Sequence, residues 1–225
     1  MDRRQMLGSV AALPLALGAT RAFAKESLKG KFKQGVCDAV FAEGTSFEDR
    51  CKLAQACGAK GYDFVADTAL FPVAKKYGLA LTIIAPAMDG KLILRPQKMP
   101  PGWHAAGTKD AQGAYLQGVR ESIDIAAANG CPNVLIQAGS RRAVSSEDGA
   151  NNVIEFFGKV RAQAEEKGIT LCLENLNSLG VQSPPQSLFD KAEWGWDLCK
   201  RINSKSFRVL FDIYHDALME GNVSQ

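Results

Sequence analysis

Apolar and polar positions along the chain alternate between two periods, one typical of strands and the other typical of helices. Short apolar runs predict buried strands, and segments whose apolar residues recur every three to four positions predict helices between them. The expected strands are residues 32–41, 61–65, 79–85, 133–137, 169–174 and 208–212. The expected helices are residues 46–58, 68–77, 111–129, 147–167 and 188–202. This alternation indicates a parallel sheet covered by helices.

Glycines mark the expected turns from helix to strand. Gly130 and Gly168 each follow a predicted helix, where glycine tolerates the left-handed conformation that ends it. No Gly-x-Gly-x-x-Gly motif follows the first strand, which lowers the case for a dinucleotide-binding sheet. The natural alternative is a (β/α)8 TIM barrel, a fold that typically takes about 250 residues. The chain has 225 residues.

The first residues have the layout of an export signal. The pair Arg3-Arg4 precedes an apolar stretch over residues 7–19, and Ala22-Phe-Ala24 has the small-x-small pattern of a signal-peptidase site. The apolar stretch is too short to span a bilayer, so we expect no stable membrane anchor. We interpret residues 1–24 as an export signal, and the paired arginines favour the twin-arginine route to the periplasm.

Composition and charge exclude several classes of protein. Hydrophobic residues make up 46% of the chain and charged residues 23%, as in ordinary globular proteins. Because the signal contains three arginines and one aspartate, its removal would lower the formal net charge from +3 to +1. A nearly neutral chain predicts no nucleic-acid partner. The six cysteines lack CxxC spacing, so we expect small buried side chains and few or no disulfides.

Two expected strands end on acidic side chains. Glu174 closes one apolar run, and Asp212 closes another, with His215 three residues later. Ligands bind beyond the carboxyl ends of parallel strands, so we expect these side chains to share one site. Carboxylates suit a hard cation such as Mg²⁺ or Mn²⁺, and a neutral imidazole can bind metal or a substrate hydroxyl. The alternative is structural: Asp212 caps a short helix through Met219, and His215 packs at its base.

A long irregular stretch, residues 86–110, follows the third expected strand and contains Trp103 and His104. Loops of this length in compact domains are usually functional or disordered. On a barrel this loop would lie on the catalytic face, so we interpret it as a lid with Trp103 and His104 as candidate substrate contacts. The alternative is an insertion without a role, in which His104 is a solvent-exposed loop residue.

Four segments resemble the hydroxypyruvate isomerase family of the xylose isomerase-like TIM barrels: Leu173-Glu-Asn-Leu-Asn177, Phe211-Asp-Ile-Tyr-His215, Met219-Glu-Gly-Asn222 and Trp103-His-Ala-Ala-Gly107. The resemblance runs from about Phe32 onward. It implies a proton transfer between adjacent carbons through an enediolate, with a divalent metal ion holding the substrate oxygens. In that scheme Glu174 corresponds to an acid/base glutamate and metal ligand, Asp212 to a second metal ligand, and His215 to a substrate-binding residue.

The family pattern continues through two further strands, which carry a third metal ligand and a second catalytic glutamate. We therefore expect residues 25–225 to form an incomplete barrel of about six β/α units, as judged against the usual eight. We therefore interpret the chain as a fragment of a longer protein. If it is the whole product, we expect weak folding and no isomerase activity.

The resemblance also sets the expected ligand and the rival functions. The ligand is a small carbohydrate or a hydroxy-keto acid, and the oligomeric state stays open, a homo-oligomer included. The alternatives are a ketose 3-epimerase and a non-catalytic periplasmic carbohydrate-binding protein. A phosphodiesterase of the endonuclease IV type needs several histidines for its zinc site, and this chain has two.

Overall fold

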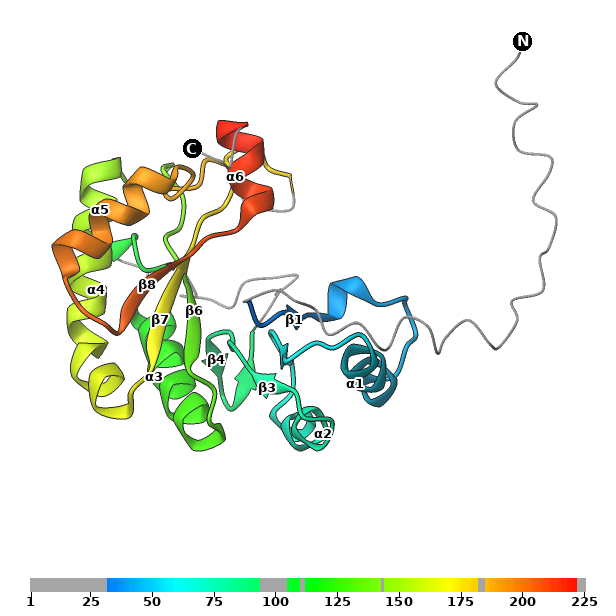
Figure 1. Cartoon of the computed structure of the whole chain (residues 1–225). Helices are drawn as coiled ribbons and strands as arrows, with labels where there is room; N and C mark the ends of the chain where they lie inside the picture. Colours follow the sequence, from blue (N-terminus) through cyan, green and yellow to red (C-terminus); the bar gives the residue numbers. More distant parts are fainter. Residues whose placement is uncertain (1–31, 94–104, 110–111, 143, 182–184, 222–225) are drawn as a thin grey trace, which may run out of the picture.

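The computed structural model describes residues 32–93, 105–109, 112–142, 144–181 and 185–221 (Figure 1). The predictions for the export signal, Trp103 and His104 fall outside these ranges.

The six predicted strands form two three-stranded parallel sheets whose order follows the chain. The first sheet contains β1 (Gly35–Val36), β2 (Gly61–Tyr62) and β3 (Ala80–Leu81), and the second contains β6 (Asn133–Gln137), β7 (Thr170–Glu174) and β8 (Phe207–Leu210). Ile84 joins the two sheets through a parallel bridge to Val134. Its amide donates to Asn133 O at 3.1 Å, and its carbonyl accepts from Leu135 N at 2.8 Å. The strands thus follow one another as in the wall of a TIM barrel.

The helices α1 to α5 flank this wall, and α6 lies beyond the end of β8 (Figure 1). They are α1 (Phe47–Ala56), α2 (Phe71–Lys76), α3 (Gln112–Asn129), α4 (Ser146–Lys167), α5 (Ala192–Ile202) and α6 (Ile213–Glu220). Ser46 caps α1, since its hydroxyl accepts from Asp49 N at 3.2 Å. Gly168 ends α4 with φ of 67°. Within the described ranges, we find no helix with the length and apolarity needed to cross a membrane.

The first half of the chain departs from the predicted elements. The expected first strand contains β1 followed by the 3-10 turn η2 (Asp38–Val40), and a second such turn, η3 (Thr68–Leu70), opens α2. The expected strand over residues 61–65 stops early because Phe64 adopts φ of 56°, outside the extended region.

The irregular stretch after β3 contains an unpredicted hairpin, β4 (Ala87–Met88) paired with β5 (Lys91–Leu92). Its two-residue turn is Asp89-Gly90, and both residues have positive φ. That geometry belongs to a type I′ turn, for which Asp-Gly is a preferred sequence. The Asp89-Gly90 pair could therefore have predicted this hairpin from the sequence.

The two faces of the parallel wall have different surroundings. The face toward the helices carries the main core, to which β7 contributes Leu171 and Leu173. The opposite face carries a small apolar cluster of Ile83, Leu135 and Cys172, against which Phe64 and Leu210 pack. Because successive strand residues point to opposite faces, Glu174 shares its face with Cys172. In a barrel this second face is the interior.

Candidate functional site

Glu174 is the last residue of β7 and lies opposite Gln137 of β6 and Leu210 of β8. It is partly exposed. Tyr115 of α3 lies close by, since its hydroxyl accepts from Gln137 N at 2.9 Å. Burial raises the pKa of Tyr115, and the negative charge of Glu174 raises it further. The carboxylate therefore lies at the carboxyl end of the strands, as predicted, within electrostatic reach of Tyr115.

Asp212 follows β8 and begins α6. Its Oδ1 accepts from Tyr214 N at 2.8 Å and from His215 N at 3.3 Å, so it caps the helix as the structural alternative describes. Its Oδ2 lies 3.7 Å from His215 Nε2. Capping therefore uses one carboxylate oxygen and leaves the other facing the imidazole.

The alternation of side chains along β8 places Asp212 on the interior face. Val209 and Phe211 both line a hollow of about 350 Å³ beside α5, together with Trp196. Leu210 packs on the interior cluster instead. Asp212 comes two residues after Leu210 and has an extended backbone. Glu174, at the end of β7, and Asp212, two residues after β8, thus lie on the same face, and the apolar hollow lies on the other face.

His215 is 6% exposed. Its Nδ1 lies 2.8 Å from Nδ2 of Asn177, and its ring meets the Tyr214 ring edge-on at 5.2 Å between centroids. The structure therefore brings Asp212 and His215 together and adds Asn177, which we did not assign to the site. The sequence feature that could have indicated Asn177 was the pair of asparagines, Asn175 and Asn177, directly after an apolar strand.

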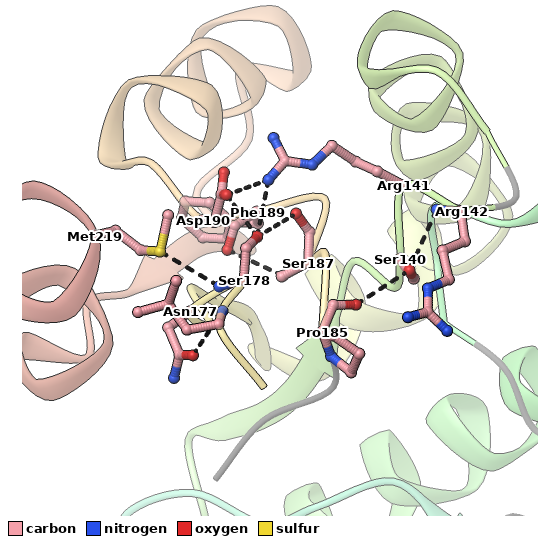
Figure 2. A network of polar contacts seen from close by, with 11 residues as sticks. Ser140, Arg141, Arg142, Asn177, Ser178, Pro185, Ser187, Phe189, Asp190 and Met219 are labelled. Atoms are coloured by element: carbon pink, nitrogen blue, oxygen red, sulfur yellow. Dashed lines mark hydrogen bonds and ion pairs between the residues drawn. The ribbon is translucent and has the colours of Figure 1, made fainter. Parts of the chain in front are cut away.

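A polar network ties the loops beside this site together (Figure 2). Arg141, after β6, donates to Ser178 Oγ at 2.8 Å and forms an ion pair with Asp190. Ser178 Oγ donates to Asp190 Oδ2 at 2.6 Å, and Ser178 N donates to Met219 Sδ of α6 at 3.3 Å. The Asp190 carboxylate is buried, with 5% of its side chain exposed. The network fixes the loop after β7 to its neighbours on both sides.

The donor set fits a divalent cation in part. The carboxylates of Glu174 and Asp212 are the oxygen ligands that hard cations prefer. Within the described ranges, however, no three histidine, cysteine, aspartate or glutamate side chains are grouped so that they could hold a metal ion. Glu174 and Asp212 could therefore supply only part of a coordination shell.

Comparison with known proteins agrees with the fold. A family model described as xylose isomerase-like TIM barrel matches residues 47–223. A crystal structure of a family 2 AP endonuclease from Brucella melitensis is similar, with TM-score 0.65, 19% identity, and coverage of 85% of this chain and 73% of that one. No curated protein sequence matches the chain.

Two further solved structures share the fold. One is a D-psicose 3-epimerase determined in the presence of D-fructose, with TM-score 0.60, 15% identity, and coverage of 85% of this chain and 67% of that one. The other is the IOLI protein with a bound zinc atom, with TM-score 0.63, 11% identity, and coverage of 85% and 66%. The chain thus spans about two thirds of the length of these two proteins, as an incomplete barrel does.

Proposed function

Because the chain belongs to the xylose isomerase-like TIM barrel family, we propose that it is an isomerase of small α-hydroxy carbonyl compounds or sugars. The observation that carries the proposal is the placement of Glu174 and Asp212. Glu174 ends β7, Asp212 follows the neighbouring parallel strand β8 on the same face, and Asp212 Oδ2 lies 3.7 Å from His215 Nε2. Acidic side chains at strand ends on this face are where barrel enzymes hold and transform ligands.

Glu174 is the proposed acid/base. A carboxylate at this position takes a proton from the carbon beside a carbonyl group and returns it to the neighbouring carbon. Such positioned proton transfer contributes about 10²- to 10⁴-fold to the rate. The fixed strand position of Glu174, between Gln137 and Leu210, supports this role because a base must be held against the carbon it serves.

A divalent cation is the proposed cofactor. Glu174 and Asp212 would hold it, with further ligands from outside the described residues. When bound, the ion stabilises negative charge on the substrate oxygens during proton transfer. The zinc in the IOLI structure supports a metal in general, and the carboxylate donors favour Mg²⁺ or Mn²⁺.

Hydroxypyruvate is the proposed substrate, on the strength of the Asp212-Ile-Tyr-His215 and Met219-Glu-Gly-Asn222 segments. Epimerisation of a ketose at C3 is the second candidate, favoured by the likeness to D-psicose 3-epimerase. The arginine pair and apolar stretch before residue 24 support a further proposal, that the protein acts after export to the periplasm.

Hydrogen exchange tests the proposal. The chain, together with any residues that its gene encodes after residue 225, is incubated in D₂O with Mg²⁺ or Mn²⁺ and with hydroxypyruvate or a small panel of ketoses. Proton NMR follows deuterium at the α-carbon. Glu174→Gln should slow exchange by at least about 100-fold, as expected for loss of a positioned base.

The control is Glu166→Gln on the exposed surface of α4, which should exchange at the wild-type rate. Circular dichroism checks that each variant keeps its fold. Undiminished exchange in Glu174→Gln would remove Glu174 from its role, and absence of exchange with every compound would remove the isomerase assignment.

A further inference from the structure

Asn177 is held in one orientation by the backbone of its own loop. Its side-chain oxygen accepts from Leu179 N at 3.0 Å and from Val181 N at 3.4 Å, and its Nδ2 donates to Val181 O at 2.7 Å. An asparagine amide is symmetric in shape, so its orientation is assigned from its partners. A flipped amide would set its NH₂ group against two backbone N–H groups and its oxygen against a carbonyl. The backbone therefore selects Oδ1 as acceptor and Nδ2 as donor.

This orientation determines which nitrogen of His215 carries the proton. Nδ2 of Asn177 lies 2.8 Å from His215 Nδ1, and Asn177 is fully buried. A donor at that distance requires Nδ1 to present its lone pair, because an N–H at Nδ1 would face the N–H of the amide. A neutral imidazole with a bare Nδ1 carries its proton on Nε2.

The protonated nitrogen is also the one that faces the site. His215 Nε2 is directed toward Asp212 Oδ2 at 3.7 Å, a separation longer than a hydrogen bond. We propose that Asn177 is a positioning residue that fixes His215 in the Nε2–H tautomer, so that His215 donates a hydrogen bond to a substrate oxygen and does not bind metal through Nε2. That a substrate oxygen meets this N–H rests on the proposed function, whereas the tautomer and its fixing by Asn177 do not.

The Nε2–H tautomer distinguishes two roles of His215 that the sequence leaves open, metal binding and hydrogen bonding to substrate. Metal binding through Nε2 needs its lone pair, and in this tautomer the lone pair is on Nδ1 and taken by Asn177. The substrate group that meets Nε2–H must be an acceptor, such as a carbonyl, hydroxyl or carboxylate oxygen. The three backbone contacts of Asn177 make this preference a property of the folded loop, independent of any bound ion.

Nitrogen-15 NMR of the imidazole rings tests the inference directly. The chain has two histidines, so His104→Gln assigns both sets of signals. Spectra are recorded at about pH 8.5, two units above the ordinary pKa of histidine, where a typical ring is neutral. Long-range proton–nitrogen correlations should show the Nε2–H pattern for His215 in the wild-type protein. An Nδ1–H pattern there would overturn the proposal without any substitution at Asn177.

Asn177→Asp is the diagnostic variant. One carboxylate oxygen keeps the contacts to Leu179 N and Val181 N, and the other replaces the amide donor with an acceptor facing Nδ1. The major species of the His215 ring should therefore change from Nε2–H to one protonated at Nδ1. Asn151→Asp, on the exposed surface of α4, adds the same charge elsewhere and should leave the spectrum unchanged.

An unchanged His215 spectrum in a folded Asn177→Asp protein would refute the positioning role. If that variant does not fold, Asn177→Ser provides the second test and should lower the share of the Nε2–H form. No substrate or metal is present in these measurements. Failure of the tautomer prediction is therefore distinguishable from absence of isomerase activity, which would affect only the proposed function.

Discussion

Asn175 and Asp212 exchange two hydrogen bonds across the ends of β7 and β8. Asp212 N donates to Asn175 Oδ1 at 2.6 Å, and Asn175 Nδ2 donates to Asp212 O at 3.1 Å. The last hydrogen bond between the backbones of the two strands comes just before these, where Asn175 N donates to Leu210 O at 3.4 Å. The Asn175 side-chain amide thus continues the pairing of the two strands by one residue and holds the Asp212 backbone against the end of β7.

Asn175→Asp should destabilise the protein. The variant loses the donor to Asp212 O and places a carboxylate against that carbonyl in a buried position. Leaving a buried acceptor unpaired costs about 1–3 kcal/mol. We expect the free energy of unfolding in urea to fall by that amount. The control is Asn151→Asp, on the surface of α4. Its free energy of unfolding should stay within about 0.5 kcal/mol of the wild-type value. Equal stability of the two variants would contradict the hydrogen bonds between Asn175 and Asp212.

Arg141→Ala should cost more stability than Arg142→Ala, although the two residues are adjacent. Arg141 pairs with the buried Asp190, whereas Arg142 is exposed and contacts the exposed Gln186 at 3.2 Å. Removal of Arg141 leaves a buried carboxylate without its charge partner. Since Arg141 is itself exposed, with 40% of its side chain accessible, we expect a loss of about 2 kcal/mol, below the 3–5 kcal/mol of fully buried pairs. Arg142→Ala should change stability by about 0.5 kcal/mol or less.

Thermal unfolding of these two arginine variants provides the measurement, with circular dichroism as the signal. Similar melting temperatures for both would show that Asp190 does not depend on Arg141.

Asp63→Asn should stabilise the protein at neutral pH but not at acidic pH. Burial raises the pKa of Asp63, although a hydrogen bond from Thr82 lowers it in part. The folded protein therefore retains this proton at pH values where the unfolded chain, with a pKa of about 3.9, has released it. Stability falls as pH rises through that window and stays lower above it.

Urea unfolding at about pH 3.5 and pH 7 measures the effect, because these values lie below and well above the ordinary aspartate pKa. The gain from Asp63→Asn should be present only at the higher pH. Asp197→Asn, on the exposed surface of α5, is the control. A gain of equal size at both pH values would show that the charge of Asp63 is not the cause.

The cysteines should differ sharply in their reactivity. All six are free, and Cys57 is exposed, contrary to our expectation of burial. Burial raises the pKa of Cys131 to about 11 and that of Cys172 to about 12. Thiolates are the reactive form, so iodoacetamide at about pH 8 should label Cys57 first, and the other two only in urea. Peptide mass spectrometry reads the labels, and native labelling of Cys172 at the rate of Cys57 would contradict its burial.

The second half of the fold is predictable from sequence because its elements are long. β6 has the predicted bounds, α4 begins one residue earlier than predicted, and β7 ends on Glu174 as expected. The first half is less regular because its strands are two residues long, which is too short for hydrophobic periodicity to define. The exception in the second half is α5, which begins at Ala192 and not at the predicted residue 188.

The candidate site also has a part that the sequence predicts and a part that it does not. Glu174 and Asp212 are found by the rule that parallel strands end together. The contact between Asn177 and His215 spans 38 positions, and that between Arg141 and Asp190 spans 49. These contacts depend on how the loops cross at the strand ends, which no local pattern encodes.

The parallel wall separates stability from chemistry. Its helix-side residues form the extensive core, whereas its other side holds only the small group around Ile83, Leu135 and Cys172 within the described residues. Substitutions on that sparse side disturb few packing partners, so substrate preference can diverge there without loss of the scaffold. Proteins as different as a sugar epimerase and an AP endonuclease share this wall with the chain at 15% and 19% identity. The same scaffold can thus carry different sets of side chains on that sparse side.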